Sequence, residues 1–183
     1  VYGENKTTVG GGETAVGFEN IILKKGYKGI KEEAEAKLAE LDKNDIENFD
    51  KMQVYRSMIL SCEAMKIQSD RYADLAEKMA AEETDETRKQ ELLTIAESCR
   101  RVPWEPPRTF REAVQAINLV EVALYCDEIS SGYNIGRFDQ YLYPYYKRDK
   151  EAGILTDQDA LELLECLWLK IAESLYGLSK DGA

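Results

Sequence analysis

The segment from residue 110 to residue 125 restricts the fold of this chain more than any other feature of its sequence. Thr109 and Glu112 form a Thr-x-x-Glu capping box, which predicts that a helix begins here. The helix is apolar on most of its sides, and a helix of that kind is buried inside something larger. Three polar residues of this helix would then need hydrogen-bonding partners in the interior: Gln115, Asn118 and Glu121.

The segments before residue 103 also follow the three- and four-residue spacing of helices, and no strand pattern stands out. Residues 18–41 have this spacing, although Gly26 and Gly29 interrupt it. Asn44, with Glu47 three residues later, predicts the start of a long helix. We expect that helix to bury one stripe of side chains: Phe49, Met52, Tyr55, Ile59, Cys62, Met65, Tyr72, Leu75 and Met79.

The remaining segments complete a mainly α-helical chain. Asp85 is expected to cap a helix whose apolar face consists of Leu92, Leu93, Ile95, Ala96 and Cys99, and the prolines that follow hold the chain extended. Residues 130–136 predict a loop. The last helix starts at Thr156 and Asp159, and its inward residues are expected to be Leu161, Leu164, Leu167, Trp168, Ile171 and Leu175. We interpret the tyrosines around Pro144 as packing residues rather than as a platform for sugars or bases: Tyr141, Tyr143, Tyr145 and Tyr146.

The sequence contains no histidine, and this count removes many common catalytic devices. Ser-His and Cys-His catalysis, zinc sites with imidazole ligands and di-iron bundles built on Glu-x-x-His all require one. Carboxylate pairs such as Glu32–Glu33 and Glu82–Glu83 lie in charged helical runs, where exposure to solvent explains them. The residues therefore predict no metal site and no general base.

The net charge of −11 argues against a nucleic-acid partner, because such a surface needs clustered Lys and Arg. A membrane partner is not expected either, since no apolar run approaches the roughly 20 residues of a membrane span. The four cysteines are far apart in helix-like stretches, and no CxxC pair exists. We interpret them as buried, reduced thiols of a cytoplasmic protein: Cys62, Cys99, Cys126 and Cys166.

The first 17 residues are rich in Gly and Thr and predict a flexible loop that lacks the patterns of phosphate-binding loops. The chain begins at Val1 without a methionine and stops at Ala183 directly after an amphipathic pattern, so we expect both ends to be cut. Proteolysis, an engineered boundary or a split gene would each explain such ends. The length of 183 residues suits about one domain.

Five groups of residues stand in a fixed order along nearly the whole chain. They are residues 24–30 (KKGYKGI), residues 71–73 with 80–85 and 92–99 (LLTIAESC), residues 102–115 (VPWEPPRTFREAVQ), residues 136–146 (GRFDQYLYPYY) and residues 163–170 (LLECLWLK). In this order and spacing they resemble the glycyl radical enzyme family of the pyruvate formate-lyase type. The similarity is closer to the dehydratase, C–N lyase and decarboxylase branches than to pyruvate formate-lyase itself.

The resemblance implies that the chain is a helical fragment of a larger enzyme. Family members are several times longer and fold as a ten-stranded α/β barrel wrapped in helices, with a cysteine loop and a glycine loop meeting inside. Residues 1–183 correspond to outer helices in the N-terminal half of that barrel, ahead of the cysteine loop, and would form a partial pyruvate formate-lyase-like domain. The role of the barrel is to exclude water and oxygen and to position the substrate.

The resemblance also implies the cofactor and the partners of the parent enzyme. A radical-SAM activating enzyme makes a backbone glycyl radical, which takes hydrogen from the family's cysteine, and the thiyl radical then abstracts hydrogen from a small-molecule substrate. The parent would be a cytoplasmic homodimer of anaerobic metabolism, and the rest of its barrel would be the main partner of this chain. No cofactor is expected to bind to this chain by itself.

Neither catalytic motif of the family is present here. The family's cysteine follows a glycine in a loop, whereas the four cysteines of this chain follow Ser61, Ser98, Tyr125 and Glu165. The radical glycine stands in an Arg-Val-x-Gly-aromatic motif, and residues 101–104 begin in the same way but contain no glycine. No catalytic residue is therefore carried over from the family.

Two positions are expected to touch substrate in a complete enzyme. Gly12 and Glu13 match the spacing of the family's Gly-His loop, whose histidine often faces the substrate, and the glutamate is a departure from that pattern. A solvated loop glutamate is the alternative for Glu13. Asn134 stands where some members place a polar substrate-binding side chain, and its alternative is a turn residue that bonds its own backbone. Arg137 and Asp139 are expected to form a structural ion pair or structural hydrogen bonds rather than to act in catalysis.

The parent is thus expected to be a glycyl radical lyase or dehydratase, or a formate acetyltransferase-like enzyme. It would cleave a C–O, C–N or C–C bond of a small organic molecule. This chain alone is expected to be inactive. The alternatives are a stand-alone helical binding or assembly module without catalysis and an unrelated all-α bundle.

Overall fold

The computed structural model describes residues 14–15, 17–127 and 133–177 of the chain. Their elements, in chain order, are β1 (Thr14–Ala15), a π-helical turn (Phe18–Ile22), α1 (Leu23–Glu40), a 3-10 turn (Ile46–Asn48), α2 (Phe49–Glu82), α3 (Glu86–Arg101), α4 (Phe110–Asp127), β2 (Tyr133–Asn134), α5 (Phe138–Glu151) and α6 (Asp157–Gly177). The predicted mainly α-helical fold is confirmed, with two short strands that the sequence did not predict. No described helix is long and apolar enough to cross a membrane.

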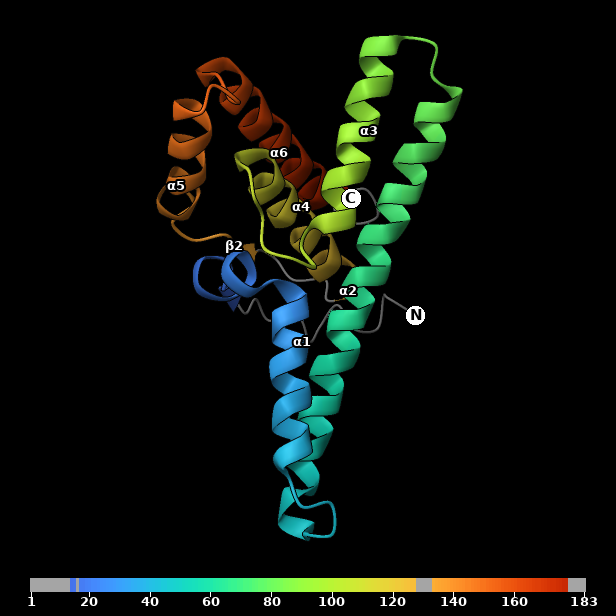
Figure 1. Ribbon diagram of the computed structural model, residues 1–183, viewed down its shortest axis with the longest axis vertical. Helices are drawn as coiled ribbons and strands as arrows, with labels where there is room; N and C mark the ends of the chain where they lie inside the picture. Colours follow the sequence, from blue (N-terminus) through green and yellow to red (C-terminus); the bar gives the residue numbers. More distant parts are fainter. Residues whose placement is uncertain (1–13, 16, 128–132, 178–183) are drawn as a thin grey trace. The chain divides into compact units, whose positions relative to one another are not determined.

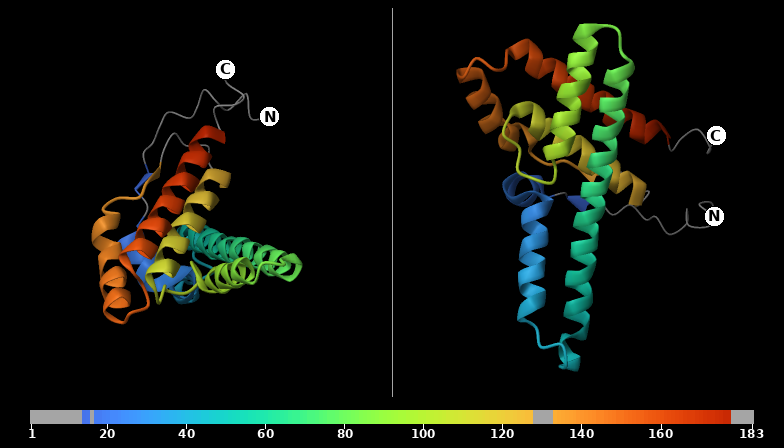
Figure 2. Two further views of the ribbon diagram at one scale, coloured as in Figure 1. Left: turned by 90° about the horizontal axis from the view of Figure 1, so that it is seen from above. Right: turned by 45° about the vertical axis from the view of Figure 1, so that its right-hand side comes forward.

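The chain divides into two compact units, and each is described by itself. The first unit contains residues 1–18 and 108–183, and the second contains residues 19–107. In the second unit, α1 packs along the N-terminal half of α2 and α3 packs along its C-terminal half (Figures 1 and 2). Arg100 of α3 strengthens this packing, because its guanidinium pairs with Asp74 and, at 3.0 Å, with Glu77 of α2.

Gly26 breaks the regular path of α1 near its start. Its φ is 64°, a left-handed value that favours glycine. A Cβ atom here would lie 2.3 Å from the carbonyl oxygen of Trp104. The backbone N–H groups of Tyr27 and Lys28 instead donate to the carbonyl oxygens of Pro103 and Trp104 at 3.0 and 2.9 Å. The interruption expected at Gly26 therefore joins α1 to the proline-rich segment after α3.

The cap before α2 differs from the predicted one. Asp45, not Asn44, precedes the 3-10 turn, and its carboxylate accepts a hydrogen bond from the Glu47 N–H at 2.9 Å. The N–H of Asn44 donates to the side chain of Asp42 at 2.9 Å. A 3-10 turn separates the cap from α2, and this shifts the start of the long helix to Phe49.

The buried stripe of α2 agrees with the prediction in its first half only. Met52, Cys62 and Met65 are buried as expected. Further along, Tyr72, Leu75 and Met79 are 42 to 53 % exposed, and Phe49 at the start of the helix is exposed as well. Small residues are buried along this second half instead: Ser69, Ala73, Ala76 and Ala80. Small side chains allow α3 to pack closely on this face, so tertiary packing overrides the larger apolar stripe.

The cap of α3 is confirmed, since the Asp85 carboxylate accepts hydrogen bonds from the N–H groups of Thr87 and Arg88 at 2.8 and 3.2 Å. Leu92, Ala96 and Cys99 are buried as expected. Leu93 was expected on the same face and is 40 % exposed, because α3 presents one narrow stripe to α2.

In the first unit, α4 is the most deeply buried helix, and both α5 and α6 pack against it. Ala113, Ala116 and Ile117 have no exposed surface, in agreement with the expectation of a buried helix. On α6, Leu167 is buried, but Leu161 and Trp168 are 49 and 48 % exposed, which the prediction of an inward stripe did not anticipate. The described part of the chain covers only one face of α6.

A hydroxyl and a carboxylate cap the N-terminus of α4, where backbone N–H groups have no partners inside the helix. The Glu112 N–H donates to the Thr109 hydroxyl at 3.2 Å, which confirms one half of the capping box. The Glu112 carboxylate, however, accepts from the Arg108 N–H rather than the Thr109 N–H. Asp149 of α5 completes the cap, since its buried carboxylate accepts from the Phe110 N–H at 2.6 Å.

The start of α6 is a reciprocal capping box, as predicted. The Thr156 N–H donates to the Asp159 carboxylate at 2.9 Å, and the Asp159 N–H donates to the Thr156 hydroxyl at 3.1 Å.

The tyrosines around Pro144 differ from one another in their burial. Tyr141 is buried, whereas Tyr143 is 57 % exposed. Packing is therefore the role of only some members of this cluster.

Candidate functional site

The two short strands join parts of the first unit that are far apart in sequence. β1 and β2 pair in parallel, with Thr14 opposite Tyr133 and Ala15 opposite Asn134. Figures 1 and 2 show β2 just before the turn into α5. The pairing places the segment directly after the Gly12–Glu13 loop beside the strand that contains Asn134. Glu13 itself, like most of the predicted loop of residues 1–17, lies outside the described residues.

Asn134 combines an exposed position with a local turn. Its side-chain oxygen Oδ1 accepts a hydrogen bond from the Gly136 N–H at 2.7 Å, and Gly136 has a φ of 71°. This is the turn geometry that stood as the alternative for Asn134. The bond uses Oδ1, and the amide nitrogen Nδ2 has no acceptor among the described residues.

Arg137 and Asp139 follow this turn and form the expected ion pair, with 3.2 Å between the guanidinium and the carboxylate. Hydrogen bonds from the side chains of Arg137 and then Gln140 lower the pKa of Asp139 to about 2. A carboxylate held in its charged form by a neighbouring cation is a poor proton acceptor at neutral pH. The pair therefore has a structural role at the start of α5.

Tyr141 anchors the chain between β2 and α5, a contact that the sequence did not indicate. Its hydroxyl donates to the carbonyl oxygen of Ile135 at 2.7 Å. Its ring lies 6.1 Å from the ring of the fully buried Phe18, measured between centroids. The residue after Asn134 is thus tied to a buried tyrosine of α5.

Glu121 is a buried carboxyl group with a raised pKa, a property that functional acids often have. The sequence indicated that Gln115, Asn118 and Glu121 would need partners inside the apolar helix. The first two are half-buried, and Glu121 is only 4 % exposed. Its Oε1 atom has no hydrogen-bond donor among the described residues. Burial raises the pKa of Glu121 to about 7 from its ordinary value of 4.5.

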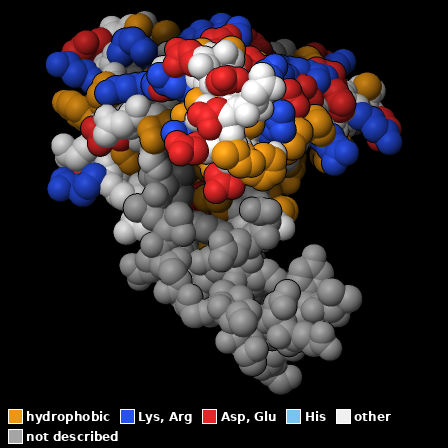
Figure 3. All heavy atoms as spheres, turned by 90° about the horizontal axis from the view of Figure 1, so that it is seen from below, with side chains coloured by type: hydrophobic (Ala, Val, Ile, Leu, Met, Phe, Trp, Pro, Cys, Tyr) orange, Lys and Arg blue, Asp and Glu red, His pale blue; other side chains and the backbone are white. Residues whose placement is uncertain are grey.

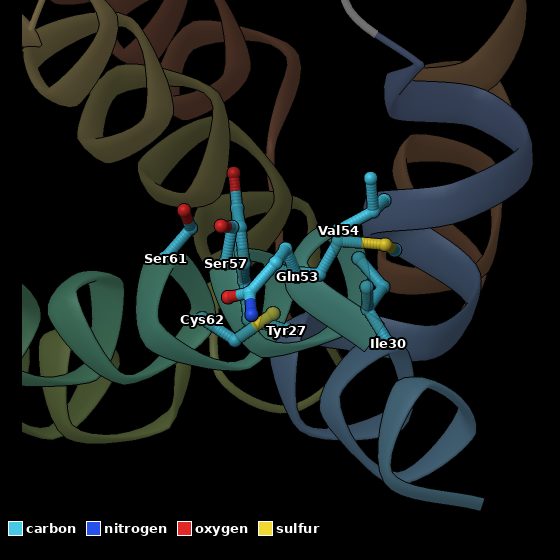
Figure 4. Close-up of a pocket in the computed structure, with 8 residues that line it drawn as sticks. Tyr27, Ile30, Gln53, Val54, Ser57, Ser61 and Cys62 are labelled. Atoms are coloured by element: carbon cyan, nitrogen blue, oxygen red, sulfur yellow. The ribbon is translucent and has the colours of Figure 1, made fainter. Parts of the chain in front are cut away.

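Two hollows of the surface are lined by no side chain suited to act as an acid or a base at neutral pH. The larger, of about 480 Å³, lies between α1 and α2, and Figure 4 shows Tyr27 and Ile30 of α1 facing Gln53, Ser57 and Cys62 of α2 across it. Burial raises the pKa of Tyr27 to about 12, so its hydroxyl stays protonated at neutral pH. This hollow is an apolar surface of the second unit without an acid or a base suited to neutral pH.

The smaller hollow, of about 300 Å³, lies between α5 and α6 and is lined by aromatic rings with Asp139 and Asp157 at its edge. Arg137 pairs with Asp139, and Lys150 pairs with Asp157. Both carboxylates are neutralised by cations of this chain. More generally, acidic and basic side chains intermingle on the face of the described residues shown in Figure 3.

Residues 1–180 match the family described as "Pyruvate formate lyase-like". The chain belongs to this family. It is 44 % identical over 161 residues to trans-4-hydroxy-L-proline dehydratase from Clostridioides difficile, and the match covers 87 % of this chain and 20 % of that protein. It is 43 % identical to isethionate sulfite-lyase from Bilophila wadsworthia, with coverage of 84 % and 19 %.

A solved structure agrees with this assignment. A glycyl radical enzyme from Archaeoglobus fulgidus superimposes with a TM-score of 0.83 at 37 % identity, and the match covers 88 % of this chain and 21 % of that one. The chain therefore spans about a fifth of the length of the relatives that it matches. The resemblance to the glycyl radical enzymes is confirmed, and so is the interpretation of the chain as a helical part of such an enzyme.

The cysteines of this family member are in helices, where the sequence placed them. Cys62 and Cys99 are buried, and burial raises the pKa of both thiols, that of Cys99 to about 11. Cys126 and Cys166 are exposed, so the prediction of a buried thiol is wrong for these two. They lie on the parts of α4 and α6 that the described chain leaves uncovered. None of the four has the loop position of the family's catalytic cysteine, and no step of radical chemistry is assigned to them.

Proposed function

We propose that this chain is part of a glycyl radical lyase or dehydratase that acts on a small organic molecule, and that the chain alone is inactive. The relatives named as dehydratase and sulfite-lyase support this assignment. The pairing of β1 with β2 supports a particular location for the substrate site, because this pairing joins the segment after Glu13 to the strand of Asn134. These are the two positions that the sequence predicted to touch substrate.

In this proposal, residues 1–183 form part of the N-terminal half of the parent barrel, ahead of its cysteine loop. The segment of Gly12 and Glu13 is proposed to lie at the substrate site, directly before β1. The radical, which a radical-SAM activating enzyme installs on a glycine outside this chain, supplies hydrogen abstraction through the parent's cysteine. The residues of this chain bind and orient the substrate and help to exclude water. The parent is proposed to be a cytoplasmic homodimer of anaerobic metabolism.

The substrate would meet one donor and one acceptor from this chain. Nδ2 of Asn134 would donate to a carboxylate or hydroxyl oxygen, while Oδ1 remains bonded to the Gly136 N–H. Glu13 would accept from a hydroxyl or ammonium group, in place of the family's histidine. The bond that breaks would be a C–O, C–N or C–C bond, and the isethionate sulfite-lyase relative adds elimination of sulfite as a further class.

Electron paramagnetic resonance tests the proposed inactivity. The 183-residue chain, treated with an activating enzyme without oxygen, should show no glycine-centred doublet. A doublet from this chain by itself would refute the proposal. The gene on both sides of Val1 and Ala183 provides a second test. A reading frame that continues into a Gly-Cys loop supports an enzyme fragment, whereas a start codon and a stop codon at these points support a stand-alone binding module.

The role of Asn134 is tested in the longer enzyme by Asn134→Asp. Aspartate keeps an oxygen for the Gly136 N–H and replaces the donating nitrogen with an acceptor. The turn should persist, and KM should rise about 10-fold or more, because one lost hydrogen bond to a charged or polar group is worth about 1–3 kcal/mol. Asn134→Ala, which loses both groups, should also weaken the fold. An unchanged KM in Asn134→Asp would show that Asn134 is a turn residue only.

A further inference from the structure

Among the described residues, one oxygen of the Glu121 carboxyl group lacks the partner that a buried polar group normally has. It projects from the most buried helix of the first unit and is 4 % exposed, yet Oε1 accepts no hydrogen bond from the described residues. Buried polar side chains are nearly always paired, and an exception calls for an explanation. The apolar surroundings favour the protonated, uncharged form of such a carboxyl group.

Two tyrosine hydroxyls interact electrostatically with Glu121. Tyr125 stands four residues later on α4 and therefore on the same face of the helix. Tyr141 belongs to α5, which packs against α4. Burial, and then the negative charge of Glu121, raises the pKa of both hydroxyls. One of these hydroxyls is on the helix of Glu121 and the other is on the neighbouring helix α5.

The hydroxyl of Tyr141 connects this carboxyl group to the candidate site. It has one proton, and it donates that proton to the carbonyl oxygen of Ile135 at 2.7 Å. Ile135 follows Asn134, and Gly136, whose N–H bonds the Asn134 side chain, follows Ile135. The Tyr141 hydroxyl thus bonds the residue that lies between Asn134 and Gly136 in the turn.

We propose that Glu121 is a positioning residue for the strand that contains Asn134 and that it acts through the Tyr141 hydroxyl. A charged carboxylate is a stronger acceptor than a backbone carbonyl group. When Glu121 is protonated, no charged acceptor competes with Ile135, and the bond to the Ile135 carbonyl is kept. When Glu121 ionises, it attracts the Tyr141 proton and loosens the segment after β2. That this segment borders a substrate site rests on the proposed function.

The structural part of this proposal is tested by NMR on the 183-residue chain. The backbone amide signals of Asn134 and Gly136 are followed from about pH 5 to about pH 9. Wild-type protein should show a shift with a midpoint near 7, and the carboxyl carbon of Glu121 should titrate with the same midpoint. The absence of histidine keeps imidazole titration out of this pH range.

Two variants separate positioning from a merely structural role. Glu121→Gln keeps the shape of the side chain without its charge, so the two amide signals should lose their pH dependence. Tyr141→Phe keeps the buried ring without its hydroxyl, so the amide signals should again lose it while the Glu121 carbon still titrates. An amide titration that persists in either variant would overturn the proposal. If Glu121→Gln fails to fold, Tyr141→Phe alone decides the question.

Turnover of the longer enzyme provides the second readout. Wild-type KM should rise several-fold as the pH rises through 7, and in Glu121→Gln it should not depend on pH in this range, with kcat little changed in both. A pH-dependent KM in Glu121→Gln would overturn the link to substrate binding. If the longer protein shows no radical chemistry at all, the proposed function fails, whereas the NMR result still supports or refutes the coupling of Glu121 to Asn134.

Discussion

Replacing Glu121 with glutamine should remove a pH-dependent loss of stability from the first unit. Burial raises the pKa of this carboxyl group from 4.5 to about 7, so the folded state holds its proton more tightly than the unfolded state does. The stability that comes from the bound proton is fully present below pH 4.5 and is lost as the pH rises through 7. A shift of about 2.5 pKa units corresponds to at most about 3 kcal/mol.

Urea denaturation followed by the fluorescence of Trp168 measures this effect, since Trp168 lies on α6 and its ring packs 5.5 Å from that of Phe138. A Trp104→Phe background removes the fluorescence of the other unit. Between about pH 4.5 and about pH 8, the free energy of unfolding of the wild type should fall by up to about 3 kcal/mol more than that of Glu121→Gln.

The test compares how steeply the free energy of unfolding changes with pH in the two proteins, and not the absolute stability of the variant. Glutamine keeps a polar group in the same apolar place, so its own cost is similar at every pH. The reasoning is refuted if both proteins lose the same stability over this pH range. It is also refuted if the wild type becomes more stable as the pH rises while Glu121→Gln does not change.

Three further substitutions or labels test the fold. Gly26→Ala should cost at least about 2 kcal/mol in urea denaturation because of its positive φ and its contact with the Trp104 carbonyl. Gly29→Ala should cost clearly less, because Gly29 has no positive φ and its added Cβ would meet only the Lys25 side chain, at 3.1 Å. Asp149→Ala should cost about 1–3 kcal/mol by leaving the Phe110 N–H unpaired, and an equal loss in the exposed control Glu151→Ala would contradict this cap. A thiol reagent should modify the exposed Cys126 and Cys166 quickly in the native chain, and the buried Cys62 and Cys99 only after denaturation. Equal rates for all four thiols would contradict this difference in burial.

Much of the local structure could be predicted because its causes are local. The caps at Asp85 and Thr156 are bonds between a side chain and backbone groups two or three residues away, so the residue pattern contains all the partners. The 3-10 turn before α2 moved the predicted cap by a single residue, from Asn44 to Asp45. Errors of this size are local as well, since one short turn decides them.

The errors of the stripe on α2 have a different origin. Apolar side chains such as Leu75 and Met79 satisfy the helical pattern as well as Met52 and Cys62 do. Which of them are buried depends on where α1 and α3 pack, and the residues buried in the half of α2 along which α3 packs include Ser69, Ala73 and Ala76. Spacing alone identifies the residues able to face a core, whereas the neighbouring helix decides which of them do.

The candidate site shows the same division. The need of Glu121 for a partner could be predicted from the sequence, because this residue is polar within an apolar helix. Asn134 stays a predicted substrate contact, because it stands beside a family pattern. The pairing of β1 with β2 and the bond from Tyr141 to Ile135 join residues whose spacing follows no period, so no pattern indicated them.

By itself, the sequence determined the helical class, most helix starts, the family and the absence of its catalytic motifs, because each depends on residue types at short spacing. Only the tertiary structure decided that Oε1 of the buried Glu121 has no donor among the described residues and that the segment after Glu13 lies beside the strand of Asn134. The reason is physical: burial and long-range pairing depend on how distant segments pack, and the local pattern of a chain does not specify that packing.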